Sequence, residues 1–209
     1  MMMQERTHND AEGAILFDAT VSSQVGHEWF AADYWGERGA LRTQSGGRGG
    51  VAIITTPIGE CVLRHYRRGG LVAALMGDRY LWTGAARTRP FAEFRVLAEI
   101  ARLELPGPVV VAARYWRHGL FYRADLITRR IADAQTLAEC LASGRMDGEL
   151  AEEVGALVAR FHRVGVWHAD LNAHNVLVTP EQLYLIDFDR GRMRIPAESW
   201  QQANLQRLR

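Results

Sequence analysis

The chain has 209 residues, of which 48% are hydrophobic, and its formal net charge is +1. This length suits one large or two small domains, and the apolar content excludes a disordered chain because it allows a sizeable core. The balanced charge does not indicate a nucleic-acid partner, so any acidic ligand must be attracted by local clusters of Arg rather than by the protein as a whole.

Cysteine content and the start of the chain set the expected environment. Cys61 and Cys140 are far apart and form no Cys-x-x-Cys pattern, so neither a disulfide framework nor a zinc ribbon is indicated and a reducing cytosol is the default. The first residues lack the features of a signal peptide, and no stretch approaches the length of a transmembrane span. We expect a soluble protein, or one held only at a membrane surface.

The first half of the chain predicts mainly strands. After a polar amino-terminal segment, Val51–Thr56 reads as a strand from its β-branched residues, and a turn at Gly59 leads into a second strand, Cys61–Tyr66. Another hairpin is expected from Val109–Trp116 and Leu120–Ile127. Between the two hairpins an amphipathic helix is predicted to begin at Pro90, with apolar residues at helical spacing: Phe91, Phe94, Leu97, Ala98 and Ala101.

A glycine-rich stretch precedes the first of these hairpins. Glycines alone more often mark a turn than a phosphate site, and the Gly-Lys-Ser/Thr end of a P-loop is missing, which excludes the usual NTPase. The position ahead of a strand that bears a cation favours phosphate binding, because backbone N–H groups there can approach phosphate without interference from a Cβ. The predicted nucleotide-binding glycines are Gly46, Gly47, Gly49 and Gly50.

The cation on the second strand is Arg64. Kinases carry a Lys on this strand, which pairs with the nucleotide phosphates. A surface Arg on an edge strand is the alternative interpretation, but a guanidinium is also a fixed cation that binds phosphate with two hydrogen bonds. Its partner should come from the following helix, where Glu93 is the better candidate and Glu99 the reserve.

The second half predicts helices. A short helix is expected over Thr136–Leu141 and a longer one over Leu150–Val164, with Gly165 at the carboxyl end of the longer one. Strands in front and helices behind indicate an α+β fold with two lobes inside a single domain, 1–209. The β-sheet N-lobe with one helix would cover about 13–128, and a reduced, mainly helical C-lobe about 129–209.

The most informative segment runs from His168 to Asp189. Phosphoryl transfer needs a carboxylate beside the attacking hydroxyl and oxygen ligands for Mg²⁺ on the nucleotide phosphates. Asp170 would be the catalytic base, and Asn175 and Asp187 the metal ligands. Kinases have the same order of residues: an Asp, then four residues and an Asn, then an apolar hairpin followed by Asp-Phe. The hairpin brings the two metal ligands together at its open end. The alternative is a polar loop in which Asp170 and Asn175 only form hydrogen bonds with backbone groups of the turn.

Two other metals fit the same segment poorly. His162, His168 and His174 are six residues apart, which does not place ligands on one helical face, and no Cys accompanies them, so the segment does not predict zinc. Asp187, Asp189 and Glu198 fit positions one, three and twelve of an EF-hand loop, but Arg192 stands where Gly is needed. The sequence therefore favours magnesium.

Several motifs together resemble the 3-deoxy-D-manno-octulosonic acid (Kdo) kinases of lipopolysaccharide core assembly. The similarity covers about residues 13–209, and the catalytic loop alone would indicate only the kinase-like superfamily. The motifs are Val62-Leu63-Arg64-His65-Tyr66-Arg67-Arg68-Gly69-Gly70, Asp78-Arg79-Tyr80-Leu81-Trp82, Thr88-Arg89-Pro90-Phe91 with Glu93-Phe94, Tyr122-Arg123-Ala124-Asp125-Leu126-Ile127-Thr128 and His168-Ala169-Asp170-Leu171-Asn172.

The resemblance implies a two-lobed protein-kinase-like fold. It also implies transfer of the ATP γ-phosphate to the 4-hydroxyl of Kdo on a lipid A precursor, at the cytoplasmic face of the inner membrane. It implies Asp170 as the base, Mg²⁺ at Asn175 and Asp187, and Arg64 in place of the kinase Lys. An Arg-rich surface would suit the Kdo carboxylate, the lipid A phosphates and an anionic membrane surface. The resemblance implies no particular oligomeric state.

The sequence departs from the kinase pattern at two points. Asp189 stands where Asp-Phe-Gly has its Gly, and no Ala-Pro-Glu segment follows, so control by an activation loop is not expected. The chain ends within a predicted amphipathic helix, Trp200–Arg209, which suggests that the natural protein continues. The alternatives are a kinase for another sugar, such as a heptose or an aminoglycoside, and an inactive module that binds nucleotide or lipid.

Overall fold

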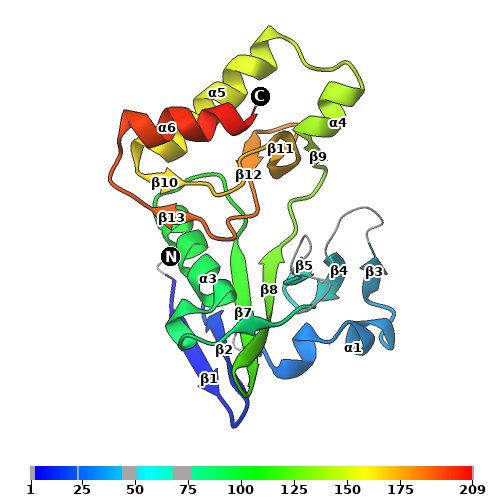
Figure 1. Ribbon diagram of the computed structural model, residues 1–209. Coiled ribbons are helices and arrows are strands. Elements are labelled where there is room, and N and C mark those ends of the chain that lie inside the picture. Colours follow the sequence, from blue (N-terminus) through cyan, green and yellow to red (C-terminus); the bar gives the residue numbers. More distant parts are fainter. Residues whose placement is uncertain (1–2, 23, 44–50, 68–76, 209) are drawn as a thin grey trace. The chain divides into compact units, whose positions relative to one another are not determined.

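The computed structural model describes residues 3–22, 24–43, 51–67 and 77–208 (Figure 1). The chain divides into two compact units, one made of Met1–Arg95 and Val109–Arg130, the other of Val96–Pro108 and Ile131–Arg209. The division passes through a helix, α3, so the second unit also contains the end of that helix and the segment that follows it. Strands dominate the first unit and helices the second, which confirms the predicted α+β class.

The first unit is built on an 8-stranded antiparallel sheet with the order β1-β2-β7-β8-β5-β4-β3, and β6 pairs with β8. Its strands are β1 (Glu5–Asn9), β2 (Gly13–Asp18), β3 (Leu41–Thr43), β4 (Val51–Thr56), β5 (Gly59–His65), β6 (Tyr80–Leu81), β7 (Val110–His118) and β8 (Phe121–Arg129). The remaining elements are η1 (His27–Phe30), α1 (Ala32–Gly36), η2 (Ala85–Arg87) and α3 (Arg89–Arg102).

Both predicted hairpins are present in this sheet. In the first, β4 and β5 pair with Ile54 opposite Cys61, and in the second, β7 and β8 pair through to His118 opposite Phe121. The sequence did not predict the hairpin of β1 and β2. All residues of β1 are exposed, so this strand lacks the alternation of apolar and polar residues that identifies a half-buried strand.

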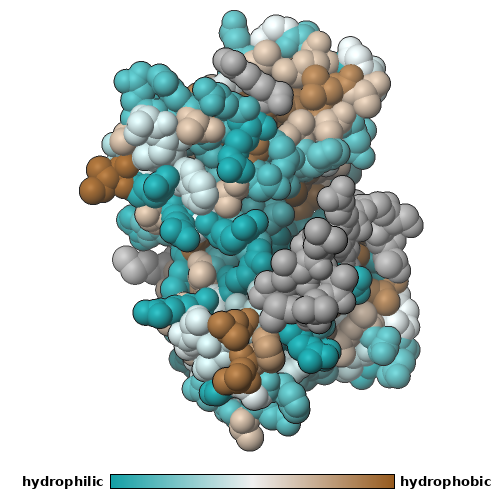
Figure 2. Space-filling model, viewed as in Figure 1, coloured by the Kyte–Doolittle hydropathy of each residue, from teal (hydrophilic) through white to brown (hydrophobic). Residues whose placement is uncertain are grey.

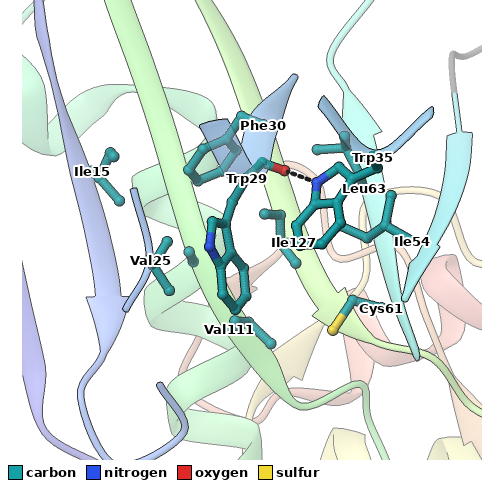
Figure 3. Packing of buried hydrophobic residues seen from close by; sticks show 11 residues of the cluster. Ile15, Val25, Trp29, Phe30, Trp35, Ile54, Cys61, Leu63, Val111 and Ile127 are labelled. Carbon is teal, nitrogen blue, oxygen red and sulfur yellow. Dashed lines mark hydrogen bonds between the residues drawn. The ribbon is translucent and has the colours of Figure 1, made fainter. Parts of the chain in front are cut away.

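A cluster of tryptophans covers one face of this sheet (Figure 3). Trp29 in η1 and Trp35 in α1 lie against each other with their ring centroids 5.6 Å apart, and the Trp35 indole N–H donates to the Trp29 carbonyl over 2.9 Å. Because a buried indole N–H needs an acceptor, this hydrogen bond makes the burial of Trp35 favourable. Strand residues complete the cluster, among them Ile15, Ile54, Cys61, Leu63, Val111 and Ile127.

Beside the end of α3, the second unit contains the helices α4, α5 and α6, a three-stranded sheet in the order β12-β11-β9 and a two-stranded sheet of β10 and β13. Its elements are β9 (Gln135–Thr136), α4 (Leu137–Ala142), α5 (Gly148–Arg163), β10 (Val166–Trp167), η3 (Ala173–Asn175), β11 (Val176–Val178), β12 (Leu183–Leu185), β13 (Arg192–Met193), α6 (Glu198–Leu205) and η4 (Gln206–Leu208). None of the helices in the described part of the chain combines the length and apolar character that a membrane span requires.

Local signals define the starts of α4 and α5 and the end of α5. Thr136 and Glu139 form a reciprocal capping box at the start of α4, and the Asp147 side chain caps α5 by accepting from the Leu150 N–H. After α5 the chain reverses at Gly165, whose φ is 84°. A Cβ there would lie 2.0 Å from the Arg194 carbonyl oxygen, so only glycine fits.

Candidate active site

The loop that carries Asp170 is anchored by a buried histidine. His168 is 1% exposed, its Nδ1 accepts from the Asp170 N–H over 3.2 Å, and its Nε2 lies 2.8 Å from the Ile186 carbonyl oxygen. Because Nδ1 accepts, Nε2 must carry the proton and donate. Burial lowers the pKa of His168, against the Ile186 carbonyl and the carboxylates of Asp187 and Asp170, which raise it. The ring is therefore neutral at pH 7. Its two nitrogens bind the backbone of Asp170 and the backbone of Ile186, which precedes Asp187.

Two amides converge on the backbone of Asp170. The side-chain N–H groups of Asn172 and Asn175 donate to the Asp170 carbonyl over 3.1 and 2.8 Å. Asn172 also accepts from the His174 N–H over 2.9 Å, which caps the short helix η3. The Asp170 side chain itself is exposed. The backbone of the loop is thus fixed while the carboxylate stays accessible to a hydroxyl.

The hairpin of β11 and β12 brings Asn175 close to the residue before Asp187. Val176 pairs with Leu185, and the next hydrogen bond runs from the Ile186 N–H to the Asn175 carbonyl over 2.9 Å. Asn175 directly precedes β11 and Asp187 follows Ile186, so the ends of the hairpin place the two predicted metal ligands beside one another. The kinase order predicted this juxtaposition.

The chemistry of these side chains suits Mg²⁺. Asn175 is 9% exposed, and its amide nitrogen is engaged with the Asp170 carbonyl, which leaves Oδ1 as the atom that would bind a cation. Asp187 adds a carboxylate and has a φ of 61°, a left-handed conformation that is uncommon outside glycine and concentrates at functional positions. An amide oxygen and a carboxylate are hard ligands, and Mg²⁺ needs few of them from protein when it binds nucleotide phosphates.

In the first unit, Arg64 and Glu93 form the ion pair that the sequence predicts. Tyr66 contacts both members of the pair: its hydroxyl accepts from the Arg64 guanidinium over 3.2 Å and donates to the Glu93 carboxylate. Glu93 is only 3% exposed, so the guanidinium and the hydroxyl compensate a buried charge. Burial, followed by the Glu93 charge, raises the pKa of Tyr66 well above its ordinary value, so Tyr66 remains a donor.

The prediction of Glu99 as a reserve partner for Arg64 was wrong. Glu99 pairs instead with Arg102, one helical turn away on α3, with a shortest distance of 2.6 Å. Such pairs at i and i+3 form locally on any helix and need no partner from a strand. The four glycines predicted to bind nucleotide, Gly46, Gly47, Gly49 and Gly50, lie outside the described residues, and their role stays a prediction.

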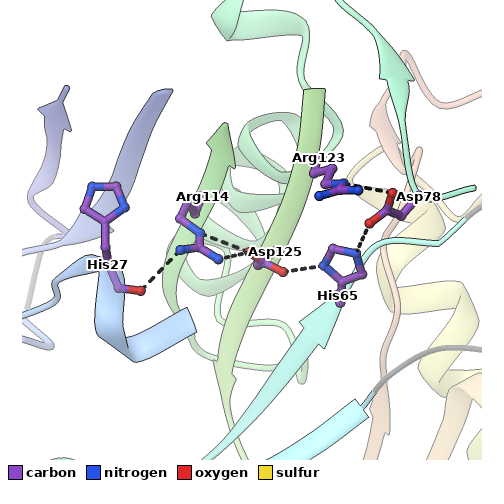
Figure 4. Close-up of polar contacts among 6 residues, drawn as sticks. All are labelled: His27, His65, Asp78, Arg114, Arg123 and Asp125. Atoms are coloured by element: carbon purple, nitrogen blue, oxygen red, sulfur yellow. Dashed lines mark hydrogen bonds and ion pairs between the residues drawn. The ribbon is translucent and has the colours of Figure 1, made fainter. Parts of the chain in front are cut away.

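Residues of the motifs that carry the family resemblance also form a charge network in this unit (Figure 4). Asp125, 2% exposed, accepts from the Arg114 guanidinium over 2.7 and 3.0 Å and lies 2.7 Å from His65 Nδ1. His65 Nε2 lies 3.0 Å from Asp78, which accepts from Arg123 over 2.9 Å. The sequence pointed to His65, Asp78, Arg123 and Asp125 only through the resemblance and did not point to Arg114, because neither spacing nor periodicity shows that these residues meet.

The position of His65 predicts a pH-dependent stability. Its hydrogen bond with Asp125 comes first among the causes that raise its pKa above the ordinary 6.5, with Asp78 adding and burial opposing. The cation is therefore favoured in the folded state, and its contribution is present in full below 6.5 and is lost as pH rises through the raised pKa. Arg114 and Arg123 face the same carboxylates and limit the effect.

We expect the melting temperature of the wild-type protein to fall relative to that of His65→Gln as pH rises from below 6.5 through the raised pKa of His65. Gln retains a hydrogen-bonding group but does not titrate, so the difference between the two curves isolates His65. Parallel curves over this range would show that folding does not raise the pKa of His65.

Comparison with known proteins identifies relatives over almost the whole chain. Residues 32–209 match the lipopolysaccharide kinase (Kdo/WaaP) family. The chain is 46% identical over 198 residues to a 3-deoxy-D-manno-octulosonic acid kinase of Xylella fastidiosa (strain M12), which covers 94% of this chain and 79% of that protein. Proteins with the same description from Xanthomonas axonopodis pv. citri (strain 306) and Stenotrophomonas maltophilia (strain R551-3) are each 49% identical, over 94% of this chain and 78% of theirs.

A solved structure has the same fold. It is described as WaaP in complex with acyl carrier protein, and the match has a TM-score of 0.52 at 18% identity, covering 83% of this chain and 72% of that one. At this identity the likeness concerns the fold alone. It confirms the kinase-like fold that the sequence predicted.

Proposed function

Because the chain belongs to the lipopolysaccharide kinase (Kdo/WaaP) family and is thus an ATP-dependent sugar kinase that acts on Kdo in the lipopolysaccharide core, we propose that it phosphorylates the 4-hydroxyl of Kdo on a lipid A precursor. The observation that carries the proposal is the arrangement of the catalytic loop. Asp170 is exposed on a loop whose backbone is held by His168, Asn172 and Asn175.

Each residue has a separate task in this proposal. The Asp170 carboxylate orients the acceptor hydroxyl and takes its proton as the phosphoryl group is transferred. Arg64, held by Glu93 and Tyr66, provides a fixed cation for the nucleotide phosphates. Asn175 and Asp187 would hold Mg²⁺, which when bound neutralises charge on the transferred phosphate.

Asp187→Asn tests the metal assignment. Replacing the carboxylate by an amide removes a charge from the ligand set, so we expect weaker binding of Mg²⁺-ATP and a lower rate, by about tenfold or more at low Mg²⁺, with partial recovery as Mg²⁺ is raised. Steady-state rates measured over a Mg²⁺ series give this comparison, with Glu181→Gln, an exposed carboxylate in the turn between β11 and β12, as the control. An unchanged Mg²⁺ dependence in Asp187→Asn would remove Asp187 from the metal site.

A panel of acceptors tests the substrate. The protein is incubated with ATP and Mg²⁺ together with a Kdo-containing lipid A precursor, a heptose-containing core lipid or an aminoglycoside, and mass spectrometry detects the gain of one phosphate. We expect phosphorylation of the Kdo lipid alone. Transfer to the heptose lipid or the aminoglycoside in its place would favour the other sugar kinases, and ATP binding without any transfer would favour the inactive module.

We also propose that the protein works as a peripheral protein at the cytoplasmic face of the inner membrane, where a lipid acceptor would be found. The face seen in Figure 2 is mainly hydrophilic, with apolar side chains exposed in a few separate places. In the sequence, two exposed apolar residues lie beside basic residues: Met193 and Ile195, 41% and 89% exposed, follow the exposed Arg190 and Arg192. Apolar side chains among cations suit an anionic membrane surface.

Binding to vesicles tests this second proposal. We expect the protein to sediment with vesicles that contain phosphatidylglycerol and not with phosphatidylcholine vesicles, and the double substitution of Arg192 and Ile195 by Ser to weaken binding by about fivefold or more, since each Arg near such a surface contributes about 1 kcal/mol. Leu141→Ser, which removes a half-exposed apolar side chain from α4, is the matched control. Equal binding of the double variant and the wild type would exclude this segment as the contact.

A further inference from the structure

The helix α6 sends a buried amide to the catalytic loop. Asn204 is 1% exposed, although its neighbours Ala203 and Leu205 are exposed. Its Nδ2 donates to the His168 carbonyl over 2.7 Å, and its Oδ1 lies 3.1 Å from His162 Nε2. A buried amide is costly unless both its N–H donor and its oxygen are hydrogen-bonded. Here the donor binds the carbonyl of His168, two positions before Asp170.

A second side chain from the same region reaches the next carbonyl. The Arg207 guanidinium in η4 donates to the Ala169 carbonyl over 2.9 Å. The carbonyls of His168 and Ala169 are consecutive and directly precede Asp170. Together with the Nδ1 of His168, which accepts from the Asp170 N–H, they fix the peptide units that lead into the predicted base.

A network behind Asn204 sets the orientation of its amide. Since Nδ2 donates to the His168 carbonyl, Oδ1 must accept, and His162 Nε2 is the donor. The His162 ring is held by Trp200, with ring centroids 5.1 Å apart, and its carbonyl accepts from Gln201 over 3.0 Å. Burial lowers the pKa of His162, so the ring is neutral at pH 7 and its Nε2–H donates to the Asn204 amide oxygen.

We propose that Asn204 and Arg207 are positioning residues, which hold the His168 and Ala169 carbonyls so that the Asp170 carboxylate faces the acceptor hydroxyl. The inference rests on phosphoryl transfer through Asp170 as proposed above, and it is independent of which hydroxyl is the acceptor. Neither side chain touches a substrate in this proposal; both act through the backbone of the catalytic loop.

Asn204→Asp is the sharpest substitution, because it preserves the shape and replaces the donor by a negatively charged acceptor. A carboxylate oxygen would face the His168 carbonyl, so the loop must shift to relieve the repulsion. Since small misplacements of a catalytic group cost up to about 100-fold, we expect kcat per folded molecule to fall by about ten- to 100-fold while KM for ATP changes less than about twofold.

Gln202→Glu is the matched control. It makes the same change from amide to acid on the exposed face of α6, and kcat should remain at the wild-type value. Arg207→Ala provides a second variant at an exposed position, where loss of folding is not expected; it should lower kcat by about fivefold or more, and Arg207→Lys, which keeps a donor, should recover most of that loss.

Hydrogen exchange measured by mass spectrometry separates this inference from the proposed function. Peptides that cover residues 166–175 should exchange faster in Asn204→Asp than in the wild type and in Gln202→Glu, whether or not the acceptor is Kdo. Faster exchange without phosphorylation of Kdo by the wild type would support the positioning and overturn only the proposed acceptor. Unchanged exchange, or a lower melting temperature with an unchanged kcat in Asn204→Asp, would overturn the positioning role.

Discussion

Asp170→Ala is expected to lower kcat by about 1000-fold while ATP binds with nearly wild-type affinity, because a positioned general base contributes about 100- to 10,000-fold to the chemical step. The carboxylate is exposed, while its backbone is held by hydrogen bonds from Asn172 and Asn175 to its carbonyl. Truncation of the side chain leaves those bonds in place. The loss should therefore appear in kcat rather than in folding or in nucleotide binding.

Two further variants make this result specific. Asp170→Asn keeps the size of the side chain but cannot accept the proton, so it should be as inactive as Asp170→Ala. Glu181→Ala, which removes an exposed carboxylate from the β11–β12 turn, should retain wild-type activity. If either Asp170 variant kept more than about a tenth of wild-type kcat, Asp170 would not be the base, since even a weak general base contributes about 100-fold.

The second large effect is expected at Arg64. Arg64→Ala should lose a charge-assisted contact with nucleotide phosphate worth about 2 kcal/mol, and so lower kcat/KM by tens-fold. The Arg64 side chain is 21% exposed, whereas that of Glu93 is 2% exposed, so part of the Arg64 side chain is accessible from solvent beside the buried carboxylate. Arg64→Lys should restore activity only in part, because an ammonium cannot reproduce the planar two-pronged contact.

Stability must be measured beside activity for this residue. Arg64→Ala removes the Arg64 cation from the buried Glu93 carboxylate, which keeps its hydrogen bond from the Tyr66 hydroxyl, and the loss of one partner of a buried pair destabilises the fold. Glu93→Gln in the Arg64→Ala background removes the charge of the buried carboxylate and should recover part of the melting temperature without recovering kcat/KM. Wild-type kinetics in Arg64→Ala would pass the phosphate-binding role to another residue, with Arg67 the next to test.

Much of the catalytic loop could be predicted because its chemistry is local in sequence. Asp170, Asn175 and Asp187 lie within 18 residues of one another, and an apolar hairpin between turn residues brings its own ends together whatever the rest of the chain does. The same is true of α5, where the apolar positions Val154, Leu157, Val158 and Phe161 are all buried. Local periodicity is sufficient for such elements.

What the sequence did not show depends on contacts between distant segments. The bond from Asn204 to the His168 carbonyl joins residues 36 positions apart, and the pair of His65 and Asp125 joins residues 60 positions apart. Polar side chains carry no periodic signal, and a buried polar residue is identified only by its partners. The packing of Trp29 and Trp35 on the sheet was missed for a similar reason, because short 3₁₀ and α segments show too few turns for a helical pattern.

The most direct test of the central claim is to locate the phosphate on the product. The wild-type protein is incubated with ATP, Mg²⁺ and a Kdo-containing lipid A precursor, and the product is examined by ¹H–³¹P correlation NMR, with Asp170→Asn treated in parallel. We predict a correlation between the new phosphorus and the proton on carbon 4 of Kdo, and no product from Asp170→Asn. A correlation to another sugar proton, or the same product from Asp170→Asn, would contradict the proposed reaction.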